Sequence, residues 1–426
     1  MTLDLSSGST SPSRQFAVDV VTRLRDAGYV AYWAGGCVRD LLLGKTPKDY
    51  DVATSARPEQ VRDLFGHKQT RAVGACFGVI LVHGRSGAAD IEVATFRSEG
   101  PYLDGRRPEH VVYSTPEEDA QRRDFTINGM FFDPLQSQVL DFVAGQADLQ
   151  RQVIRAIGDP LERFREDKLR LLRAIRFAAT LKFELDAHTA DAVRTMAADI
   201  NIVSAERITQ EWKRMLSHPN RLEALRLALE TDLLQHVFPE AIPMLGADET
   251  AQQLWASAVQ AVSRLTAPKF ELVLATWLSG VPGYSAATAR TMCLRLKLSN
   301  DEIDRIVWLE GHAQALDGAP EFPLSRLKRL LAHPYLEDLL ALVRARCEAN
   351  GDTLTDVEFC ETYWRTTPIE IINPPPLITG DDLIRHGLKP GKQFKVLLDA
   401  LRDAQLENRI TTFEAALQLA QELTRV

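Results

Sequence analysis

The sequence predicts an α+β head with a small mixed sheet, followed by an all-helical region that forms the rest of the chain. Short buried strand patterns alternate with helices in the first 150 of the 426 residues. After Arg151, apolar residues recur at helical spacing and strand patterns nearly disappear. Hydrophobic residues make up 45% of the chain and charged residues 25%. These values are ordinary for globular domains and exclude disorder over the whole chain.

The head is predicted to begin with a helix at residues 16–27 and a short buried strand at Tyr29–Ala34. Gly35 and Gly36 then interrupt the pattern before a second helix at Val38–Leu43. Short apolar or alternating runs predict further strands. These lie at Tyr50–Ala53, Val79–His83 and Ile91–Phe96, with a hairpin of Met130–Phe132 and Val139–Val143.

The rest of the chain carries the apolar repeat of amphipathic helices. Such patterns cover residues 161–182, 188–199, 205–217, 221–235, 251–266, 270–279, 301–315, 324–349 and 354–365. Three prolines after Asn373 then break the helical pattern before two or three final helices. We therefore predict a disordered tail at 1–15, a head at 16–150, a neck at 151–220, a helical body at 221–365 and a helical tail at 366–426.

Charge and cysteine usage limit where the protein works and what it binds. The chain has 50 basic and 58 acidic residues, a net charge of −8, which argues against a protein that coats nucleic acid. A local basic stretch nevertheless runs from Arg151 to Lys182, with nine basic and four acidic residues. The five cysteines are scattered without CxxC spacing, which argues against disulfides and structural zinc and favours a reducing cytoplasm. We expect neither a secretory signal at the start nor an apolar run of the roughly 18 residues that span a membrane.

An acidic pair beside a glycine turn is the first candidate site. If Asp49 and Asp51 lie on one strand, their carboxylates project from the same face and repel each other unless a cation lies between them. Mg²⁺ commonly uses one or two carboxylates together with substrate phosphates. Gly36 offers backbone N–H groups at a helix start to an anion, and Arg39 adds a positive charge. Either half alone is more often a plain turn or loop edge, but together they predict a site for a metal-bound triphosphate.

A third carboxylate comes from Glu92, in the predicted strand Ile91–Phe96. Ile91 and Val93 are expected to face the core, so Glu92 faces either solvent or the aspartate pair on a neighbouring strand. Two-metal phosphoryl transfer needs one ion to activate the attacking hydroxyl and one to hold the leaving phosphates. Three carboxylates can hold that pair, and both interpretations of Glu92 stay open.

The motifs and their order resemble the class II tRNA nucleotidyltransferase and poly(A) polymerase family. The resemblance begins with GGCVRDLLLGKTPKDYDVAT, continues through EVATFR, YLDGRRPEHV, EEDAQRRDFTINGM and REDKLRLLRAIRFA, and ends with ITGDDLIRHGLKPGKQFKVLLDALRDAQLENRI. It implies a polymerase-beta-like nucleotidyltransferase head and template-independent transfer from CTP or ATP to an RNA 3′ end, with release of pyrophosphate. It also implies that Asp49 and Asp51 hold Mg²⁺, with Glu92 assisting catalysis, and that Gly36 and Arg39 contact the nucleotide.

The segment Arg122–Asn128 is, on its residues alone, a turn with an arginine–aspartate pair. The resemblance implies that Arg123 and Asp124 bind the incoming nucleotide near its sugar. A carboxylate accepts a hydrogen bond from a ribose hydroxyl that deoxyribose lacks, while an arginine contacts phosphate. Asn128 is expected to support this turn.

The predicted neck helix at 161–182 carries the candidate base reader. Asp167 and Arg170 stand three residues apart, which on a helix makes them neighbours and, in the simplest interpretation, an ordinary ion pair. Cytosine and adenine both present an amino donor beside a ring-nitrogen acceptor, whereas uracil and guanine present the reverse. A carboxylate beside a guanidinium therefore selects CTP and ATP without a template, and the resemblance assigns this role to Asp167 and Arg170. It also places Arg173 and Arg176 near the nucleotide, although helix geometry turns Arg176 about half a turn from Asp167, toward phosphate, RNA or a structural partner.

Three further segments bear on the substrate. In the family, a loop at residues 97–108 accommodates ATP, and its presence here favours CCA-adding or A-adding activity over the addition of C alone. Residues 252–279 contain no histidine, so we expect no second hydrolase metal site of the kind some relatives carry. By the resemblance, the tail grips tRNA. The candidate loop residues are Tyr102, Asp104, Arg106 and Arg107, and the basic tail residues are Lys389, Lys392, Lys395, Arg402 and Arg409.

The sequence leaves the RNA substrate open. The expected activity is completion of the CCA end of tRNA, as a full CCA-adding or an A-adding enzyme, and a poly(A) polymerase with the same site is the nearest alternative. A non-catalytic RNA-binding protein is disfavoured by the intact acidic and arginine motifs. A small-molecule nucleotidyltransferase does not account for the long helical region. The sequence does not indicate the oligomeric state.

Overall fold

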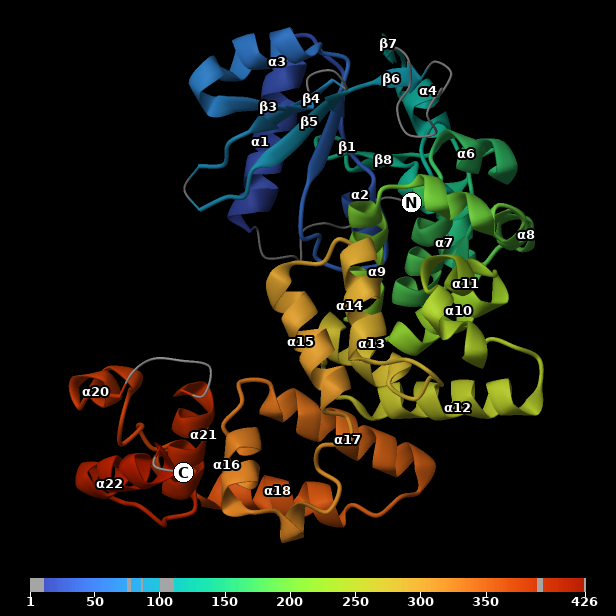
Figure 1. Ribbon diagram of the computed structural model, residues 1–426. Coiled ribbons are helices and arrows are strands. Elements are labelled where there is room, and N and C mark those ends of the chain that lie inside the picture. Colours follow the sequence, from blue (N-terminus) through green and yellow to red (C-terminus); the bar gives the residue numbers. More distant parts are fainter. Residues whose placement is uncertain (1–10, 75–77, 86, 100–110, 389–393, 425–426) are drawn as a thin grey trace. The chain divides into compact units, whose positions relative to one another are not determined.

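The computed structural model of the chain describes residues 11–74, 78–85, 87–99, 111–388 and 394–424. It divides into two compact units, Met1–Pro239 and Glu240–Val426 (Figure 1). The first unit holds the predicted α+β head and the helices that follow it, and the second is all-helical, which confirms the predicted fold class. The finer division into neck, body and tail stays a prediction.

The head of the first unit is built on a seven-stranded mixed sheet (Figure 1). Its strand order is β3-β4-β5-β2-β1-β8-β9; β2 and β5 run parallel, and the other neighbouring strands run antiparallel. The strands are β1 (Ala31–Ala34), β2 (Asp51–Thr54), β3 (Thr70–Gly74), β4 (Val79–Val82), β5 (Ile91–Thr95), β8 (Phe131–Asp133) and β9 (Gln138–Leu140). Two short pairs lie outside this sheet: β6 (Arg97–Glu99) with β7 (Val111–Tyr113), and β10 (Val153–Ile154) with β11 (Glu184–Leu185).

The predicted strands and the β8–β9 hairpin are present, but β3, β6, β7, β10 and β11 were not predicted. β3 has the sequence Thr-Arg-Ala-Val-Gly, and its residues Arg71, Ala72 and Val73 are all exposed. Since no face of this strand is regularly buried, its sequence lacks the alternation of apolar and polar residues that predicts a strand. β6 opens the segment that the sequence predicted to be a loop.

Both faces of the sheet are covered. Helix α1 (Pro12–Asp26) begins after Ser11, whose side chain accepts a hydrogen bond from the Arg14 backbone N–H. Its apolar side packs on β1 and β2, where Trp33 donates from its indole N–H to the Ala17 carbonyl at 3.2 Å. Since neighbouring strand residues point to opposite faces, Ala34 lies on the other side. There it joins a buried cluster with Ala53, Phe96, Ala120 and Phe131.

The remaining helices of the first unit are α2 (Gly36–Leu42), α3 (Pro58–Phe65), α4 (Pro116–Gln121), α5 (Gly145–Arg151), α6 (Pro160–Glu166), α7 (Leu169–Leu181), α8 (Ala187–Thr195), α9 (Ala205–Leu216), α10 (Arg221–Glu230) and α11 (Leu233–Val237). Of these, α3, α4 and α5 were not predicted, and the predicted helix at 221–235 is divided into α10 and α11. The prediction of one continuous helix at 161–182 is wrong. Asp167 is extended (φ −142°, ψ 105°), and its carboxylate accepts the Leu169 backbone N–H at 3.0 Å. This local side-chain bond competes with the helical pattern and starts a new helix.

The second unit is entirely helical in its described residues. Its helices are α12 (Glu249–Arg264), α13 (Phe270–Leu278), α14 (Ala286–Arg295), α15 (Asn300–Gly311), α16 (Leu324–Leu331), α17 (Leu336–Asn350), α18 (Thr355–Thr366), α19 (Ile369–Ile372), α20 (Gly380–Arg385), α21 (Phe394–Leu406) and α22 (Phe413–Thr424). Residues 324–349 were predicted as one helix, but Pro334 lacks the N–H that a continuous helix needs and separates α16 from α17. Helix α14 was not predicted.

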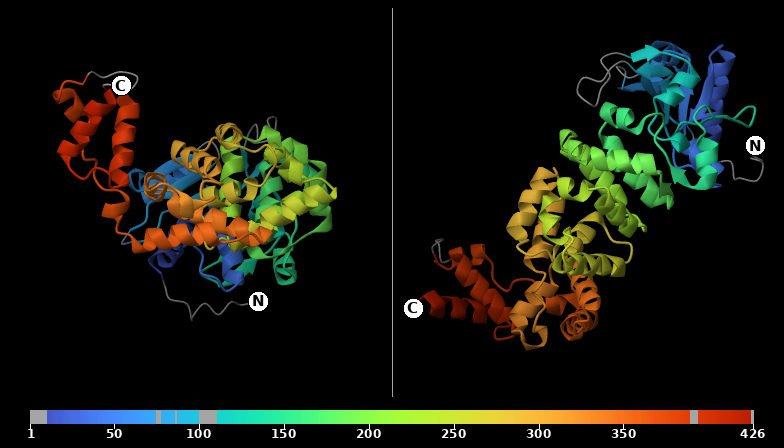
Figure 2. Two further views of the ribbon diagram at one scale, coloured as in Figure 1. Left: turned by 60° about the horizontal axis from the view of Figure 1, so that its bottom comes forward. Right: turned by 90° about the vertical axis from the view of Figure 1, so that its right-hand side faces the viewer.

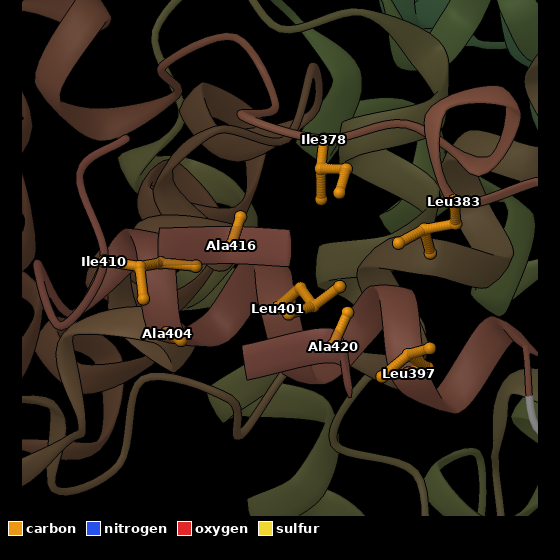
Figure 3. Packing of buried hydrophobic residues seen from close by; sticks show 8 residues of the cluster. All are labelled: Ile378, Leu383, Leu397, Leu401, Ala404, Ile410, Ala416 and Ala420. Atoms are coloured by element: carbon orange, nitrogen blue, oxygen red, sulfur yellow. The ribbon is translucent and has the colours of Figure 1, made fainter. Parts of the chain in front are cut away.

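The last three helices, red in Figure 2, share a small core of their own. Figure 3 shows its eight buried apolar side chains, which come from α20, α21, α22 and the segments beside them. Leu401 lies at the centre of this group. No helix in the described part of the chain is long and apolar enough to cross a membrane.

Candidate functional site

Asp49 and Asp51 flank a buried tyrosine at the start of β2. Tyr50 packs against Trp33 with ring centroids 4.8 Å apart, whereas both carboxylates are exposed. Strand β2 begins at Asp51, so Asp49 lies just before it. The exposed–buried–exposed order places the two carboxylates on the side away from Tyr50, in keeping with the arrangement expected from the sequence.

Glu92 is the direct neighbour of Asp51 across the sheet. The parallel pairing of β2 with β5 sets Asp51 opposite Glu92, while Ile91 and Val93 are buried. Although Asp51 is exposed as a residue, surrounding protein atoms partly desolvate its carboxyl group. This desolvation, and next the charge of Glu92, raise the pKa of Asp51 to about 6; Asp49 adds to the rise and Arg123 opposes it. Three negative groups therefore crowd this edge of the sheet.

This crowding fits a divalent cation, because a cation relieves the repulsion that raises the pKa of Asp51. Carboxylate oxygens are the ligands that Mg²⁺ prefers. Within residues 11–74, 78–85, 87–99, 111–388 and 394–424, no three His, Cys, Asp or Glu side chains form a group that could hold a metal ion by themselves. The remaining ligands of such an ion would have to come from substrate phosphates or water.

The glycine turn between β1 and α2 lies beside an arginine of the predicted nucleotide site. Gly35 has a φ of +72°, and a Cβ there would lie 3.1 Å from Nη1 of Arg123. Cys37, in the first turn of α2, is buried, and burial followed by the nearby Asp51 charge raises the pKa of its thiol to about 12. This thiol therefore stays protonated and serves packing rather than chemistry.

A hydrogen-bonded chain links α2 to α7. Nη1 of Arg39 donates to Oδ1 of Asn128 at 2.8 Å, and Nδ2 of Asn128 donates to Oδ1 of Asp124 at 3.2 Å. Arg173 donates from Nε and Nη2 to Oδ2 of Asp124, at 2.8 and 2.5 Å. Burial alone would raise the pKa of Asp124, but the charge and hydrogen bonds of Arg173 outweigh it and lower the pKa to about 2. Asp124 is therefore ionised and fixed in orientation.

Asp119 is a buried residue that the sequence analysis missed. Its Oδ1 accepts from Nε and Nη2 of Arg122, at 2.9 and 2.6 Å, and its Oδ2 accepts from Nε and Nη2 of Arg123, at 3.2 and 2.9 Å. One carboxylate thus orients both arginines and leaves Nη1 of Arg123 beside Gly35. The available signal was the acidic residue three and four positions before two consecutive arginines near a helix end.

The structure does not form the ion pair that the sequence suggested between Asp167 and Arg170. Because the helix breaks at Asp167, this residue turns to Arg207 of α9, which donates from Nη1 and Nη2 at 3.2 and 2.7 Å. Nη1 of Arg170 donates to Glu166 at 2.5 Å and to the Arg163 carbonyl at 2.8 Å. The two candidate readers remain adjacent, since the Arg170 N–H bonds to the Asp167 carbonyl at 3.0 Å.

Arg176 has a structural partner, one of the three alternatives left open for it. Its Nε donates to the buried Glu211 at 2.5 Å. Its guanidinium carbon also lies 4.0 Å from the centroid of the Phe177 ring, and those of Arg39 and Arg173 lie 5.3 and 5.2 Å from the same ring. Phe177, which the sequence analysis did not single out, thus gathers three arginines around one aromatic face or edge.

The basic tail residues differ in their hydrogen-bond partners and exposure. Arg402 donates to Gln405 and Asn373, at 2.9 and 2.7 Å, and Arg409 donates to Glu407 at 2.8 Å. Lys395 is exposed. The other candidates at the loop and tail lie outside the described residues: Tyr102, Asp104, Arg106, Arg107, Lys389 and Lys392.

Three family models match successive parts of the chain. Residues 31–155 match the "Poly A polymerase head domain", residues 182–245 the "Probable RNA and SrmB-binding site of polymerase A", and residues 269–420 "tRNA nucleotidyltransferase domain 2". The candidate catalytic and sugar-binding residues lie within the first match. The candidate base reader lies between the first and second.

Curated proteins and solved structures agree with these matches. The chain is 30% identical to the CCA-adding enzyme of Lactobacillus helveticus over 94% of its own length and 95% of that protein. It is 44% identical to poly(A) polymerase I of Salmonella typhi over 234 residues, which cover 52% of this chain and 50% of that one. The crystal structure of the Bacillus stearothermophilus CCA-adding enzyme in complex with CTP aligns with 97% of the chain and 98% of its own, with a TM-score of 0.75 and 28% identity.

Proposed function

We propose, since the chain belongs to the tRNA nucleotidyltransferase and poly(A) polymerase family, that it adds nucleotides from CTP and ATP to the 3′ end of tRNA and completes the CCA terminus. The observation that carries this proposal is one continuous network. It runs from the turn beside the acidic pair through Arg39, Asn128 and Asp124 to Arg173 on α7. Full CCA addition and A addition both fit this network.

Asp49 and Asp51 would hold Mg²⁺, with Glu92 adding negative charge beside them. When bound, the ion supplies charge neutralisation at the phosphates and lowers the pKa of the attacking hydroxyl. The 3′ oxygen of the RNA forms a bond to the α-phosphorus, the bond from that phosphorus to the pyrophosphate oxygen breaks, and the hydroxyl proton passes to solvent. Positioning and charge stabilisation supply most of the rate in such reactions.

The arginines and Asp124 divide the rest of the nucleotide between them. Arg123, held by Asp119 and pointing to Gly35, would contact the phosphates. Asp124 would accept from a ribose hydroxyl, because it is ionised and its two oxygens are already oriented by Asn128 and Arg173. A deoxyribose sugar would leave this buried carboxylate without that donor.

Asp167 and Arg170 would select the base. The Asp167 carboxylate accepts from Arg207 and from the Leu169 N–H, and a carboxylate with about four acceptor positions can still accept an amino N–H of cytosine or adenine. Arg170 would donate to the neighbouring ring nitrogen. Uracil and guanine would turn a carbonyl toward Asp167 and an N–H toward Arg170, so both contacts would be repulsive.

A poly(A) polymerase is the second candidate. It is favoured by the higher identity, 44%, to poly(A) polymerase I over about half of each chain. As to the compartment, we propose the reducing cytoplasm. Cys37, Cys293, Cys347 and Cys360 are free thiols, which suits such a compartment.

Incubation of the full chain with tRNA that ends before the CCA, after C or after CC separates the activities. Each RNA is given CTP or ATP alone in the presence of Mg²⁺. A CCA-adding enzyme extends the first two RNAs with CTP and the third with ATP, and then stops. An A-adding enzyme extends only the CC-ended tRNA, whereas a poly(A) polymerase adds long A runs to tRNA and to unrelated RNA. No incorporation on any RNA would overturn the proposed function.

A further inference from the structure

A surface hollow in the second unit has a lining unlike that of an ordinary helix junction. It has a volume of about 480 Å³ and lies among α15, α16, the turn that follows α16, and Asp403 of α21. Its lining includes an indole, two imidazoles and two guanidinium groups: Trp308, His312, His333, Arg326 and Arg329. The rings are partly exposed and both arginines are exposed, so the hollow is open to a large ligand.

The three rings are stacked. His333 lies parallel to Trp308, with ring centroids 3.8 Å apart and an interplanar angle of 4°. His312 also stacks on Trp308, at 4.3 Å and 19°. Tyr335 packs edge-on against both Trp308 and His333. The imidazoles are thus held in fixed orientations, because each plane is set by the indole.

Backbone hydrogen bonds fix which nitrogen of each imidazole carries the proton. Nδ1 of His333 accepts from the Tyr335 N–H at 3.2 Å, so its proton is on Nε2, which is a donor. Nδ1 of His312 lies 2.8 Å from the Trp308 carbonyl and must donate to it, so Nε2 of the neutral ring is an acceptor. Neither Nε2 has a hydrogen-bond partner among the residues that the structure describes. The hollow therefore presents one donor and one acceptor.

One of the two arginines is available for an anion. Arg329 donates to Asp403 at 2.6 Å and to the Asp399 carbonyl at 3.0 Å. The guanidinium of Arg326 lies 3.6 Å from the centroid of the Phe322 ring and has no acidic partner within the described ranges. It is exposed on the first turn of α16, where it adds positive charge to the rim.

We propose that this hollow binds the ribose–phosphate backbone of RNA. Arg326 and Nε2–H of His333 donate to a phosphate oxygen, and Nε2 of His312 accepts from a ribose 2′-hydroxyl. The combination matches RNA because phosphate supplies only acceptors and the 2′-hydroxyl supplies a donor. A free inorganic anion would use the two donors and leave His312 unused. The inference rests on the proposed function in one respect, namely that the chain has an RNA substrate.

Binding of the full chain to tRNA without its CCA end tests the proposal. Affinity is measured by fluorescence anisotropy at several salt concentrations for wild type and for Arg326→Ala, His333→Phe and His312→Phe. The phenylalanine variants keep a ring for the stack. Arg365→Ala, an exposed arginine on α18, is the matched control. Arg326→Ala and His333→Phe should each bind about tenfold more weakly, and the salt slope should fall by about one in the arginine variant. Arg365→Ala should bind as wild type does.

His312→Phe tests the 2′-hydroxyl contact on its own. Wild type should prefer tRNA over a DNA strand of the same sequence, and this preference should narrow in the variant, with little change in DNA affinity. Thermal melting must show that each variant is folded. Wild-type tRNA affinity in all three folded variants would overturn the proposal. So would binding of inorganic phosphate that depends on Arg326 while tRNA binding does not.

The result also separates this site from the catalytic one. If wild type extends CC-ended tRNA and all three variants keep its tRNA affinity and its KM for tRNA, the RNA-binding role of the hollow is refuted and the proposed function stands. If the variants lose tRNA affinity but wild type incorporates no nucleotide, the proposed function is refuted and the RNA-binding role of the hollow is supported.

Discussion

Replacing Asp124 with Asn tests the centre of the network. In the folded chain, burial favours a higher pKa for Asp124, but the charge and hydrogen bonds of Arg173 outweigh it and lower the pKa from 3.8 to about 2. One pKa unit corresponds to about 1.4 kcal/mol, so the ionised carboxylate contributes roughly 2 kcal/mol at pH 7. The side chain of Asp124 is only 10% exposed, so solvent screens this contribution little. Leaving Arg173 without its partner can add to the loss, since removing one member of a buried pair costs about 3–5 kcal/mol.

The pH dependence of this loss has a definite sign. Because the pKa is lowered on folding, the stabilisation is fully present above 3.8 and is lost as the pH falls through about 2. The difference between wild type and Asp124→Asn should therefore be constant near neutral pH. It should shrink below about pH 4, where the unfolded carboxyl of the wild type becomes protonated.

Hydrogen exchange with mass spectrometry reports this region apart from the second unit. Peptides from α7 and from residues 122–128 should exchange faster in Asp124→Asn, by a factor that corresponds to about 2–4 kcal/mol of opening free energy. The control is Asp191→Asn, which removes an exposed partner of Arg194 on α8 and should change nothing measurable. Equal exchange in the two variants would refute the argument. So would a loss confined to acidic pH.

Three further substitutions test the rest of the site. Asp51→Asn should lower nucleotide incorporation roughly a thousandfold, because several kcal/mol of charge stabilisation is lost. The tRNA affinity measured by fluorescence anisotropy should stay at the wild-type value. A parallel loss of tRNA affinity would contradict this prediction. Arg207→Ala should weaken discrimination of CTP and ATP against UTP and GTP about tenfold, because Asp167 loses the hydrogen bonds that orient it; incorporation assays with all four nucleotides measure this, and unchanged selectivity would refute it. Asp119→Asn should raise the KM for ATP about tenfold, because Arg123 loses the carboxylate that orients it. Steady-state kinetics measure this, and Glu117→Gln, on the same helix α4, is the control that should keep the wild-type KM.

Local sequence patterns were enough to predict the elements of the head up to the acidic pair of Asp49 and Asp51. The strand before Gly35, the short helix after it and the strand that begins at Asp51 each follow from apolar runs and glycine chemistry within a few residues. The placement of Glu92 beside Asp51 needed the strand order. Alternation told which way Glu92 faces, but only the β2–β5 pairing shows that Asp51 is its neighbour.

The partners of the charged groups could not be predicted in the same way. Asp124 and Arg173 are 49 residues apart, and Asp167 and Arg207 are 40 apart, so no local pattern links them. The break at Asp167 was missed because the apolar residues continue at helical spacing from α6 into α7. This spacing does not reveal that the Asp167 carboxylate accepts the Leu169 N–H. Glu166 and Arg170 are the exception, because they stand four residues apart, a spacing that makes such pairs neighbours on any helix and that the sequence could have revealed.

The helix break brings α9 into the proposed base-reading site, because Asp167 turns to Arg207 of that helix. An Asp167 on a continuous helix would have paired with Arg170, and each would have satisfied the other before any base arrived. With the backbone extended, the carboxylate is instead held by the Leu169 N–H and by Arg207. In the proposed site, a base with an amino group would add a donor to this fixed carboxylate without displacing Arg207, whereas the carbonyl of uracil or guanine would be repelled by it. If Asp167 selects the base as proposed, its rigidity should contribute to discrimination as much as its charge does.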